Sequence, residues 1–202
     1  HENKDLIYRV TSRRIVGDKS YFSPHAPMPI AGVLKDRFPE VKHATVFNLP
    51  WHLRIQAGEK IFNNNYGARV ASSFFEIFTF SFIRGDPKTA LLDPASVVLT
   101  ESFAKQCFGS SDAVGKTINI SLKDRKVTGV IRDVPYHSHI RFDFAMPISL
   151  PGVEDKYAWR GFGSGVYVQF AHSINMAEFN KKIKDIAKEY DPKISTQFSL
   201  QP

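Results

Sequence analysis

The stretch from Ser72 to Asp143 most constrains the fold, because its short apolar runs alternate with turn-forming sequences. Gly85-Asp86-Pro87 precedes a predicted strand, Phe108-Gly109 follows a predicted helix, and Val114-Gly115-Lys116 precedes another predicted strand. Glycine and proline interrupt regular structure, so each run has the length of one short element. The stretch therefore predicts a series of small strands and helices with a core of their own.

Composition limits the classes of protein that this sequence can form. With 202 residues, 43% of them hydrophobic and 23% charged, it has the size and composition of one globular domain or two small ones. Its single cysteine, Cys107, excludes a disulfide framework within the chain. The sequence contains no run of about 18 uncharged apolar residues, and it therefore predicts no membrane-spanning helix. Because the sequence starts without Met and ends at Gln201-Pro202 inside a predicted strand, we expect a fragment of a longer protein.

The formal net charge of +7 raises the question of an anionic partner such as nucleic acid or a membrane surface. The basic residues are spread along the sequence, however. The densest group lies on the solvated face of one predicted helix and consists of Lys181, Lys182, Lys184 and Lys188. We therefore interpret the charge as a lysine-rich soluble surface and predict no nucleic-acid partner.

The beginning of the chain predicts the order β-α-β. Residues Asp5–Arg13 alternate between apolar and polar, as in a strand with one buried face, and Gly17-Asp18 predicts a turn after it. Apolar residues between Ile30 and Phe38 recur at helical spacing before Pro39 ends the helix. Val41–Gln56 reads as a long strand region.

The end of the chain predicts the order β-β-α-β. The strands are His139–Ile148, Val166–Phe170 and Ser195–Leu200. Between the last two, a helix is predicted from the capping-box-like start at Asn175 to Tyr190. Its apolar positions follow 3, 4, 3, 4 spacing and are Met176, Phe179, Ile183, Ile186 and Tyr190.

The middle of the chain has a different texture. It predicts a glycine- and asparagine-rich turn or hairpin at Gly58–Asn65. Two strand–helix pairs follow, namely Tyr66–Ala71 with Phe74–Phe78 and Ser96–Thr100 with Glu101–Phe108. The last predicted element is a strand hairpin, Thr117–Leu122 and Lys126–Val134, with its turn at Lys123-Asp124-Arg125. We predict an α+β fold in which a split βαβ…ββαβ layer, residues 1–57 and 139–202, carries an inserted mixed α/β subdomain, residues 58–138.

Two segments of the sequence are candidate sites for a phosphate and for a metal ion. Gly109–Thr117 (GSSDAVGKT) has five residues between its glycines where a phosphate-binding loop has four, and it has a predicted helix before it and a strand after it, the reverse of that motif. His137 and His139 share one face of an extended segment, but a zinc site needs further ligands. We predict no bound cofactor and no metal.

Catalytic and aromatic candidates also have simpler explanations. Cys107 lies on the apolar stripe of a predicted helix, which favours a core thiol over a nucleophile. The phenylalanines Phe74–Phe82 can line a ligand pocket but are more typical of a core. Trp51 and Trp159 are candidate interface anchors, with partial core burial as the alternative. No catalytic residue is predicted, and we expect a protein that is not an enzyme.

Many short motifs, in one order, resemble the extracytoplasmic domain of MacB/FtsX-type ABC transporter permeases, in the large form common in Bacteroidota. The resemblance covers about a third of the chain strongly. It rests on Phe74–Phe78, Gly85-Asp86-Pro87, Ser96–Ser102, Phe108-Gly109, Val114-Gly115-Lys116, Val127–Val130, Ser138-His139 and Phe142-Asp143, with His1–Asp5 and Ile7–Val10 at the start.

The resemblance implies a porter-like subdomain formed by the two ends of the chain and a Sabre-like subdomain between them. It also implies transmembrane helices upstream and downstream, a location outside the inner membrane, and ATP bound only by a separate cytoplasmic ATPase. The implied partners are those helices, the ATPase, a second permease copy and a periplasmic protein. Motion driven by ATP would pass through Tyr8–Val10 and Gln197–Leu200 and serve export of a substrate, with Gly58–Tyr136 as a partner surface.

A second interpretation is a ligand-sensing module of a membrane protein. In that case a cleft between the two subdomains would bind a peptide, a lipid or an antibiotic and bias the transporter. Aromatic residues and the loop Gly161–Gly165 would line the cleft.

Overall fold

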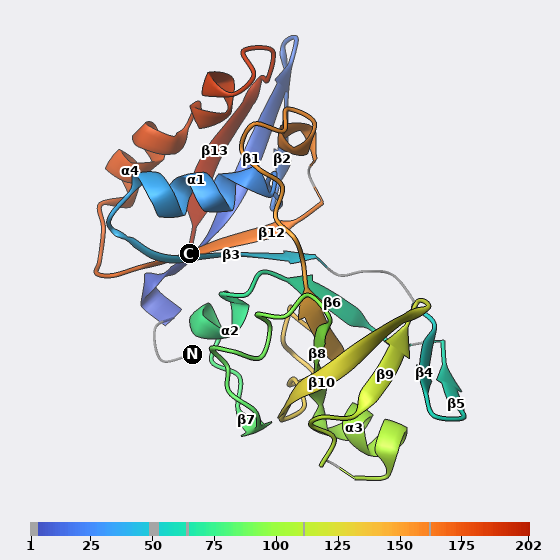
Figure 1. The fold of residues 1–202 in the computed structure, drawn as a ribbon. Coiled ribbons are helices and arrows are strands. Elements are labelled where there is room, and N and C mark those ends of the chain that lie inside the picture. Colours follow the sequence, from blue (N-terminus) through green and yellow to red (C-terminus); the bar gives the residue numbers. More distant parts are fainter. Residues whose placement is uncertain (1–3, 49–52, 64, 111, 162) are drawn as a thin grey trace. The chain divides into compact units, whose positions relative to one another are not determined.

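The computed structural model describes residues 4–48, 53–63, 65–110, 112–161 and 163–202. The chain divides into two compact units (Figure 1), the first formed by His1–Phe47 with Leu150–Pro202 and the second by Asn48–Ser149. Each unit combines strands with short helices. The predicted α+β class is therefore confirmed.

The first unit is built on an antiparallel sheet in the order β13-β1-β12-β3. These strands are Thr196–Gln201, Ile7–Val16, Gly165–Phe170 and Val41–Asn48. A 3-10 helix, Lys4–Leu6, precedes β1. Strand β2, Lys19–Ser23, folds back on the far half of β1 and forms a hairpin with it.

Helices α1 (Pro29–Arg37) and α4 (Met176–Ile183) pack beside each other on this sheet (Figure 1). The Phe179 ring joins the two layers, because its centroid lies 4.9 Å from those of Phe38, just after α1, and Phe170, at the end of β12. Burial of a large apolar side chain stabilises a fold by about 1.5–3 kcal/mol. The core between the helices and the sheet therefore stabilises the first unit.

The helix predicted from Asn175 to Tyr190 is interrupted. Helix α4 ends at Ile183, and a separate 3-10 helix, η3, spans Ile186–Glu189. The Lys184 carbonyl accepts a hydrogen bond from the Phe198 N–H of β13 at 2.9 Å, and the Lys188 N–H bonds to the Asp185 carbonyl instead. Pairing with the sheet therefore breaks a helix that the apolar spacing alone predicted as continuous.

Two further predictions for the first unit are corrected. The turn predicted at Gly17-Asp18 is present, but it joins β1, which extends to Val16, to a second strand, β2, that was not predicted, so the opening order is β-β-α-β. Gly17, with φ +57°, makes the tight turn between these strands. The strand predicted at His139–Ile148 is only Phe144–Pro147 (β11), and it pairs with strands of the second unit. The closing order within the first unit is therefore β-α-β.

The second unit contains a mixed sheet in the order β6-β11-β8-β10-β9-β4-β5, with β7 paired to β10. The pairs β6–β11 and β8–β10 are parallel and the others are antiparallel. The strands other than β11 are β4 Ile55–Ala57, β5 Lys60–Phe62, β6 Gly67–Val70, β7 Phe82–Arg84, β8 Ser96–Thr100, β9 Thr117–Ile120 and β10 Lys123–Ile131.

Two short helices complete this unit. Helix α3 (Glu101–Phe108) lies in the connection between the parallel strands β8 and β10, and Gly109, with φ +74°, ends it as predicted. Its buried residues Phe103 and Cys107 belong to an apolar core shared with the strands. Helix α2 (Phe74–Ile77) buries Phe74 among other phenylalanine rings, which confirms the core interpretation of that cluster.

Gly85-Asp86-Pro87 has a backbone explanation. Gly85 has φ +87°, and a side chain there would meet the Thr128 carbonyl of β10. Only glycine combines this φ with so close an approach. The turn that the sequence signals before β8 thus depends on tertiary packing as well as on local conformation.

Two predictions for the second unit differ from the structure. The turn between β9 and β10 lies at Ser121 and Leu122, both with positive φ, and not at Lys123-Asp124-Arg125, which begins β10. The division between the units lies at 47/48 and 149/150, outside the segment 58–138 predicted for the insertion. The reason is that β4 pairs with β9, and β11 with β6 and β8, within the second unit.

Candidate functional site

The segments Tyr8–Val10 and Gln197–Leu200, expected to transmit motion, lie on neighbouring strands. Strand β13 pairs with β1 over six residues, with Arg9 opposite Gln201 and Arg14 opposite Thr196. On its other edge, the first half of β1 pairs with β12. We call β1 and β13 the terminal strand pair. It places the two ends of the described chain beside each other on one sheet.

Side-chain contacts fasten the terminal strand pair. Thr11 Oγ1 donates to the Ser199 carbonyl at 3.0 Å and lies 2.9 Å from Ser199 Oγ. Asn180 Oδ1 of α4 accepts from the Leu200 N–H at 2.8 Å. Val10 and Leu200, which face each other, are both buried. These contacts tie the two strands to each other and β13 to the helix layer.

Arg9 connects the terminal strand pair to β12. Its Nε and Nη2 donate to Tyr167 Oη at 2.9 and 2.6 Å, and its guanidinium lies 5.2 Å from the centre of the Tyr167 ring. Burial raises the pKa of the Tyr167 hydroxyl, while the nearby Arg9 charge opposes that rise. Tyr167 is therefore a neutral acceptor at physiological pH, and it holds Arg9 in place.

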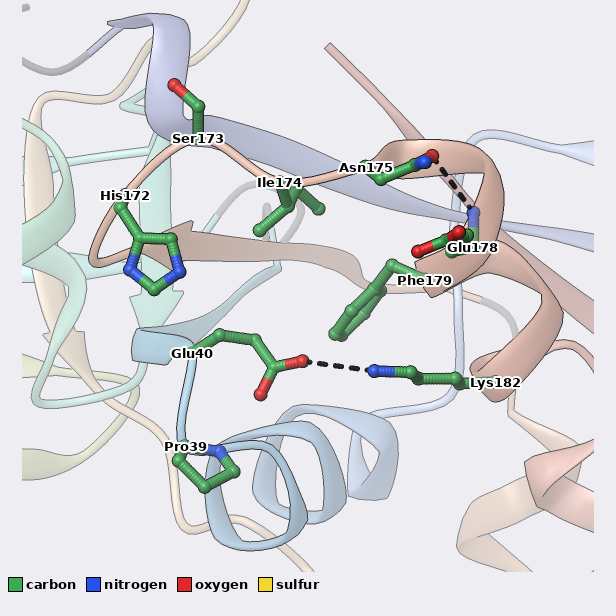
Figure 2. Close-up of a pocket in the computed structure, with 9 residues that line it drawn as sticks. All are labelled: Pro39, Glu40, His172, Ser173, Ile174, Asn175, Glu178, Phe179 and Lys182. Atoms are coloured by element: carbon green, nitrogen blue, oxygen red, sulfur yellow. Dashed lines mark hydrogen bonds and ion pairs between the residues drawn. The ribbon is translucent and has the colours of Figure 1, made fainter.

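A separate polar hollow of about 490 Å³ lies where α4 begins (Figure 2). Lys182 Nζ and Glu40 Oε1 form an ion pair across it at 3.5 Å. Asn175 Oδ1 accepts from the Glu178 N–H and so caps the helix. The other lining residues are Pro39, His172, Ser173, Ile174 and Phe179. Of the charged groups that the hollow presents, Glu40 and Lys182 are already paired with each other, and no nucleophile is hydrogen-bonded to a base among the residues that line it.

The elements on either side of the phosphate-loop candidate, Gly109–Thr117, follow the order predicted from the sequence. Helix α3 ends at Gly109, and β9 begins at Thr117. A phosphate-binding loop instead runs from a strand into a helix, whose N–H groups meet the phosphate. The local structure of Gly109–Thr117 therefore does not have the geometry of that motif.

The candidate metal ligands and the candidate thiol nucleophile have the surroundings of residues with a structural role. Ser138, between His137 and His139, makes a local turn through hydrogen bonds to Ile140. Within the described ranges, no group of three or more His, Cys, Asp or Glu side chains could hold a metal ion. Cys107 is buried, and burial raises the pKa of its thiol to about 12, so the core interpretation is confirmed.

The two tryptophans have different outcomes. Trp159 is completely buried; its Nε1 donates to the Val153 carbonyl at 2.8 Å, and its ring stacks on Tyr190. It is a core residue, more deeply buried than the partial burial expected. Trp51 lies outside the described residues. In the loop Gly161–Gly165, Gly161 follows the 3-10 helix η2 (Ala158–Arg160) as its C-cap, and Gly165 is the first residue of β12.

In the part of the chain that the structure describes, no helix has both the length and the apolar character of a membrane span.

Four of the exposed large apolar residues of the first unit lie on the β1–β2 hairpin, namely Ile15, Val16, Tyr21 and Phe22. The sequence pattern does not predict this hairpin. The alternation in Ser20–Ser23 is too short to signal a strand without its partner.

Comparison with solved structures identifies the fold. A domain of a protein assigned as a permease, from Porphyromonas gingivalis, aligns with TM-score 0.82 and 22% identity over 98% of this chain and 90% of that chain. The periplasmic region of MacB from Actinobacillus actinomycetemcomitans aligns with TM-score 0.66 and 19% identity over 96% and 87% of the two chains.

The extracellular domain of the noncanonic ABC-type transporter YknZ from Gram-positive bacteria has TM-score 0.63 and 12% identity, over 95% of this chain and 98% of that one. No curated protein matches the sequence. The family model for the MacB-like periplasmic core domain matches residues 1–186. This match spans most of both units, and the chain therefore belongs to the family of MacB-like periplasmic core domains.

Proposed function

We propose that this periplasmic core domain transmits motion from a cytoplasmic ATPase to the outer side of the inner membrane, where it serves export or extraction of a substrate. The observation that carries the proposal is the terminal strand pair, in which Arg9 faces Gln201. A body whose two ends lie on adjacent hydrogen-bonded strands moves as one piece when membrane helices pull on both ends.

The stiffness of the terminal strand pair supports this role. Thr11 and Ser199 join the strands, Asn180 ties β13 to α4, and Arg9 ties β1 to Tyr167. A force on either end therefore reaches the whole sheet of the first unit. The domain itself acts mechanically and not as an enzyme, and it binds no cofactor, because ATP is bound by the separate ATPase.

The proposed partners follow from family membership. They are the transmembrane helices of the same protein, the cytoplasmic ABC ATPase, a second permease copy, and a protein on the outer side. The second unit, which contains the whole of the predicted insertion 58–138, corresponds in this proposal to a Sabre-like subdomain, and the first unit to a porter-like one.

The test uses the full-length permease with its ATPase in proteoliposomes. Spin labels attached at Lys19 of each copy report the distance between the two first units with and without a non-hydrolysable ATP analogue. We expect a nucleotide-dependent change of distance. A flexible Gly-Ser segment inserted directly before His1 and after Pro202 should abolish the change and leave ATP hydrolysis intact, because slack at the ends cannot transmit force.

The matched control carries the same segment in the exposed β4–β5 turn at Gly58, where φ is +60° and a side chain would meet no neighbouring atom. This variant should keep the nucleotide-dependent change. A change of distance that survives the insertions at both ends would contradict mechanical transmission through the terminal strand pair.

A further inference from the structure

The tip of the β1–β2 hairpin and the chain before β13 lie side by side at one end of the first unit (Figure 1), where the Ile15 N–H donates to the Ser195 carbonyl at 3.2 Å. Tyr21 of β2, Arg14 of β1 and Thr196 of β13 lie directly opposite one another in register. Directly opposed residues of neighbouring strands project from the same face of a sheet. Lys19, opposite Val16, is two residues from Tyr21 and projects from that face too.

A pocket of about 350 Å³ lies at the base of this face. Three cationic side chains line it, from Arg14, Arg160 and Lys193, and all three residues are exposed. The buried Trp159 and Ile194 supply its apolar lining. We call this the hairpin pocket. It combines positive charge with an apolar floor.

Asp191, an acidic group bonded to two residues that line this pocket, has its oxygens already occupied. Asp191 is buried and accepts from Arg160 Nη2 at 2.8 Å and from the Lys193 N–H at 3.0 Å. The hydrogen bond from Arg160 is the main cause that lowers the pKa of the Asp191 carboxyl. Among the described residues, no carboxylate pairs with the side chain of Arg14 or Lys193. The hairpin pocket therefore has a surplus of positive charge.

The hairpin also offers a strand edge. Strand β2 pairs with β1 on one side, and no described strand pairs with its other side. Tyr21 and Phe22 on β2 are 55% and 61% exposed, values high enough to leave their rings available for contact. An exposed edge strand can accept an added strand through its backbone groups.

We propose that the β2 edge and the hairpin pocket together bind an extended acidic segment of a partner protein. The segment adds to β2 through its backbone and places carboxylates against Arg14, Lys19 and Lys193, while its apolar side chains cover Tyr21. Charge complementarity selects this occupant. A second copy of this chain would bring the same cations together and be repelled.

The surface is separate from the ends of the chain. Arg14 lies five residues along β1 from Arg9, about 17 Å at 3.4 Å per residue. The inference goes beyond the proposed transmission of motion and does not depend on it. It can be tested on the 202-residue chain alone, so its failure would leave the test of transmission unaffected.

The probe is a fluorescein-labelled peptide of alternating glutamate and valine, about six residues long, the length of a common strand. Fluorescence anisotropy should show saturable binding that weakens as NaCl rises roughly tenfold, from about 0.05 to about 0.5 M, because the Debye length shortens and charge attraction is screened. Arg14→Glu and Lys193→Glu should each weaken binding about fivefold or more, because each replaces an attraction with a repulsion.

Lys88→Glu is the matched control, since it changes the net charge equally at an exposed position of the second unit. Its affinity should equal that of the unchanged chain, and circular dichroism should confirm that all variants are folded. Absence of binding, equal loss in Lys88→Glu, or equal binding of a lysine–valine peptide would each overturn the proposal. Inhibition by inorganic phosphate at an affinity equal to that of the peptide would also overturn it, in favour of a small-anion site.

Discussion

At the scale of single residues, the ion pair between Arg160 and Asp191 joins η2 to the chain just before β13. Arg160 is exposed, whereas Asp191 is buried. The hydrogen bond from Arg160 is the largest cause that lowers the pKa of Asp191, followed by the bond from the Lys193 N–H. A carboxyl whose pKa is lowered by folding stabilises the protein above its unfolded pKa and loses that contribution as pH falls through its folded pKa.

Arg160→Gln should therefore lower the melting temperature at pH 7, where Asp191 is ionised. The difference from the unchanged chain should shrink below about pH 4, the ordinary range of aspartate, as the carboxyl becomes protonated in both proteins. Thermal melts followed by circular dichroism at pH 7 and pH 3 measure it. Arg132→Gln, at an exposed position, should change neither melt. An equal difference at both pH values would show that the ion pair is not the cause.

At the scale of elements, the start of helix α3 is held by two acceptors from different parts of the chain. Thr100 Oγ1 accepts from the Phe103 N–H and is the local cap of the helix. Asp133, which follows β10, accepts from the Ser102 N–H at 2.9 Å and also bonds the Ser102 hydroxyl. The first N–H groups of a helix have no partner within it, so both acceptors satisfy groups that would otherwise depend on water.

Asp133→Ala should destabilise the chain by about 1 kcal/mol, the usual effect of losing a helix cap. Urea unfolding followed by circular dichroism measures the free energy. Asp112→Ala serves as a control, because Asp112 is exposed and its side chain caps no helix in the described structure. If Asp133→Ala and Asp112→Ala unfold at the same urea concentration, the long-range cap contributes nothing.

At the scale of the whole molecule, each unit has its own core. An apolar cluster in the second unit runs from Ile55 to Met146 and includes Leu99, Phe103 and Ile118. All of its members belong to Asn48–Ser149. A chain segment that buries its own apolar core and contains its own paired strands can fold alone.

A fragment of residues 48–149 should therefore fold by itself and unfold in one cooperative transition. Dispersed amide signals in a proton–nitrogen NMR spectrum and a sigmoidal thermal melt would demonstrate this. The complete 202-residue chain is the reference, and its spectrum should contain most of the fragment signals. A fragment with collapsed signals and no transition would contradict an independent second unit, and with it the proposed insertion.

Features that depend on local chemistry could be predicted from the residues alone. Glycine at a position with positive φ ended α3 at Gly109, apolar spacing placed Cys107 in a core, and the motif order identified the family. The strand segments Tyr8–Val10 and Gln197–Leu200 were recognised from alternation and family resemblance. These features need only neighbours along the chain, so the pattern of a few residues is sufficient to predict them.

Which segments pair with one another became clear from the folded chain and not from the sequence. The bond from Phe198 to the Lys184 carbonyl broke the predicted long helix, and pairing with β1 made β2 a strand. The pairing of β4 with β9 moved a unit boundary. The hairpin pocket likewise gathers Arg14, Arg160 and Lys193 from three separate segments. Such outcomes depend on partners far away in sequence, whose backbone groups and charges override local preference once the sheet assembles.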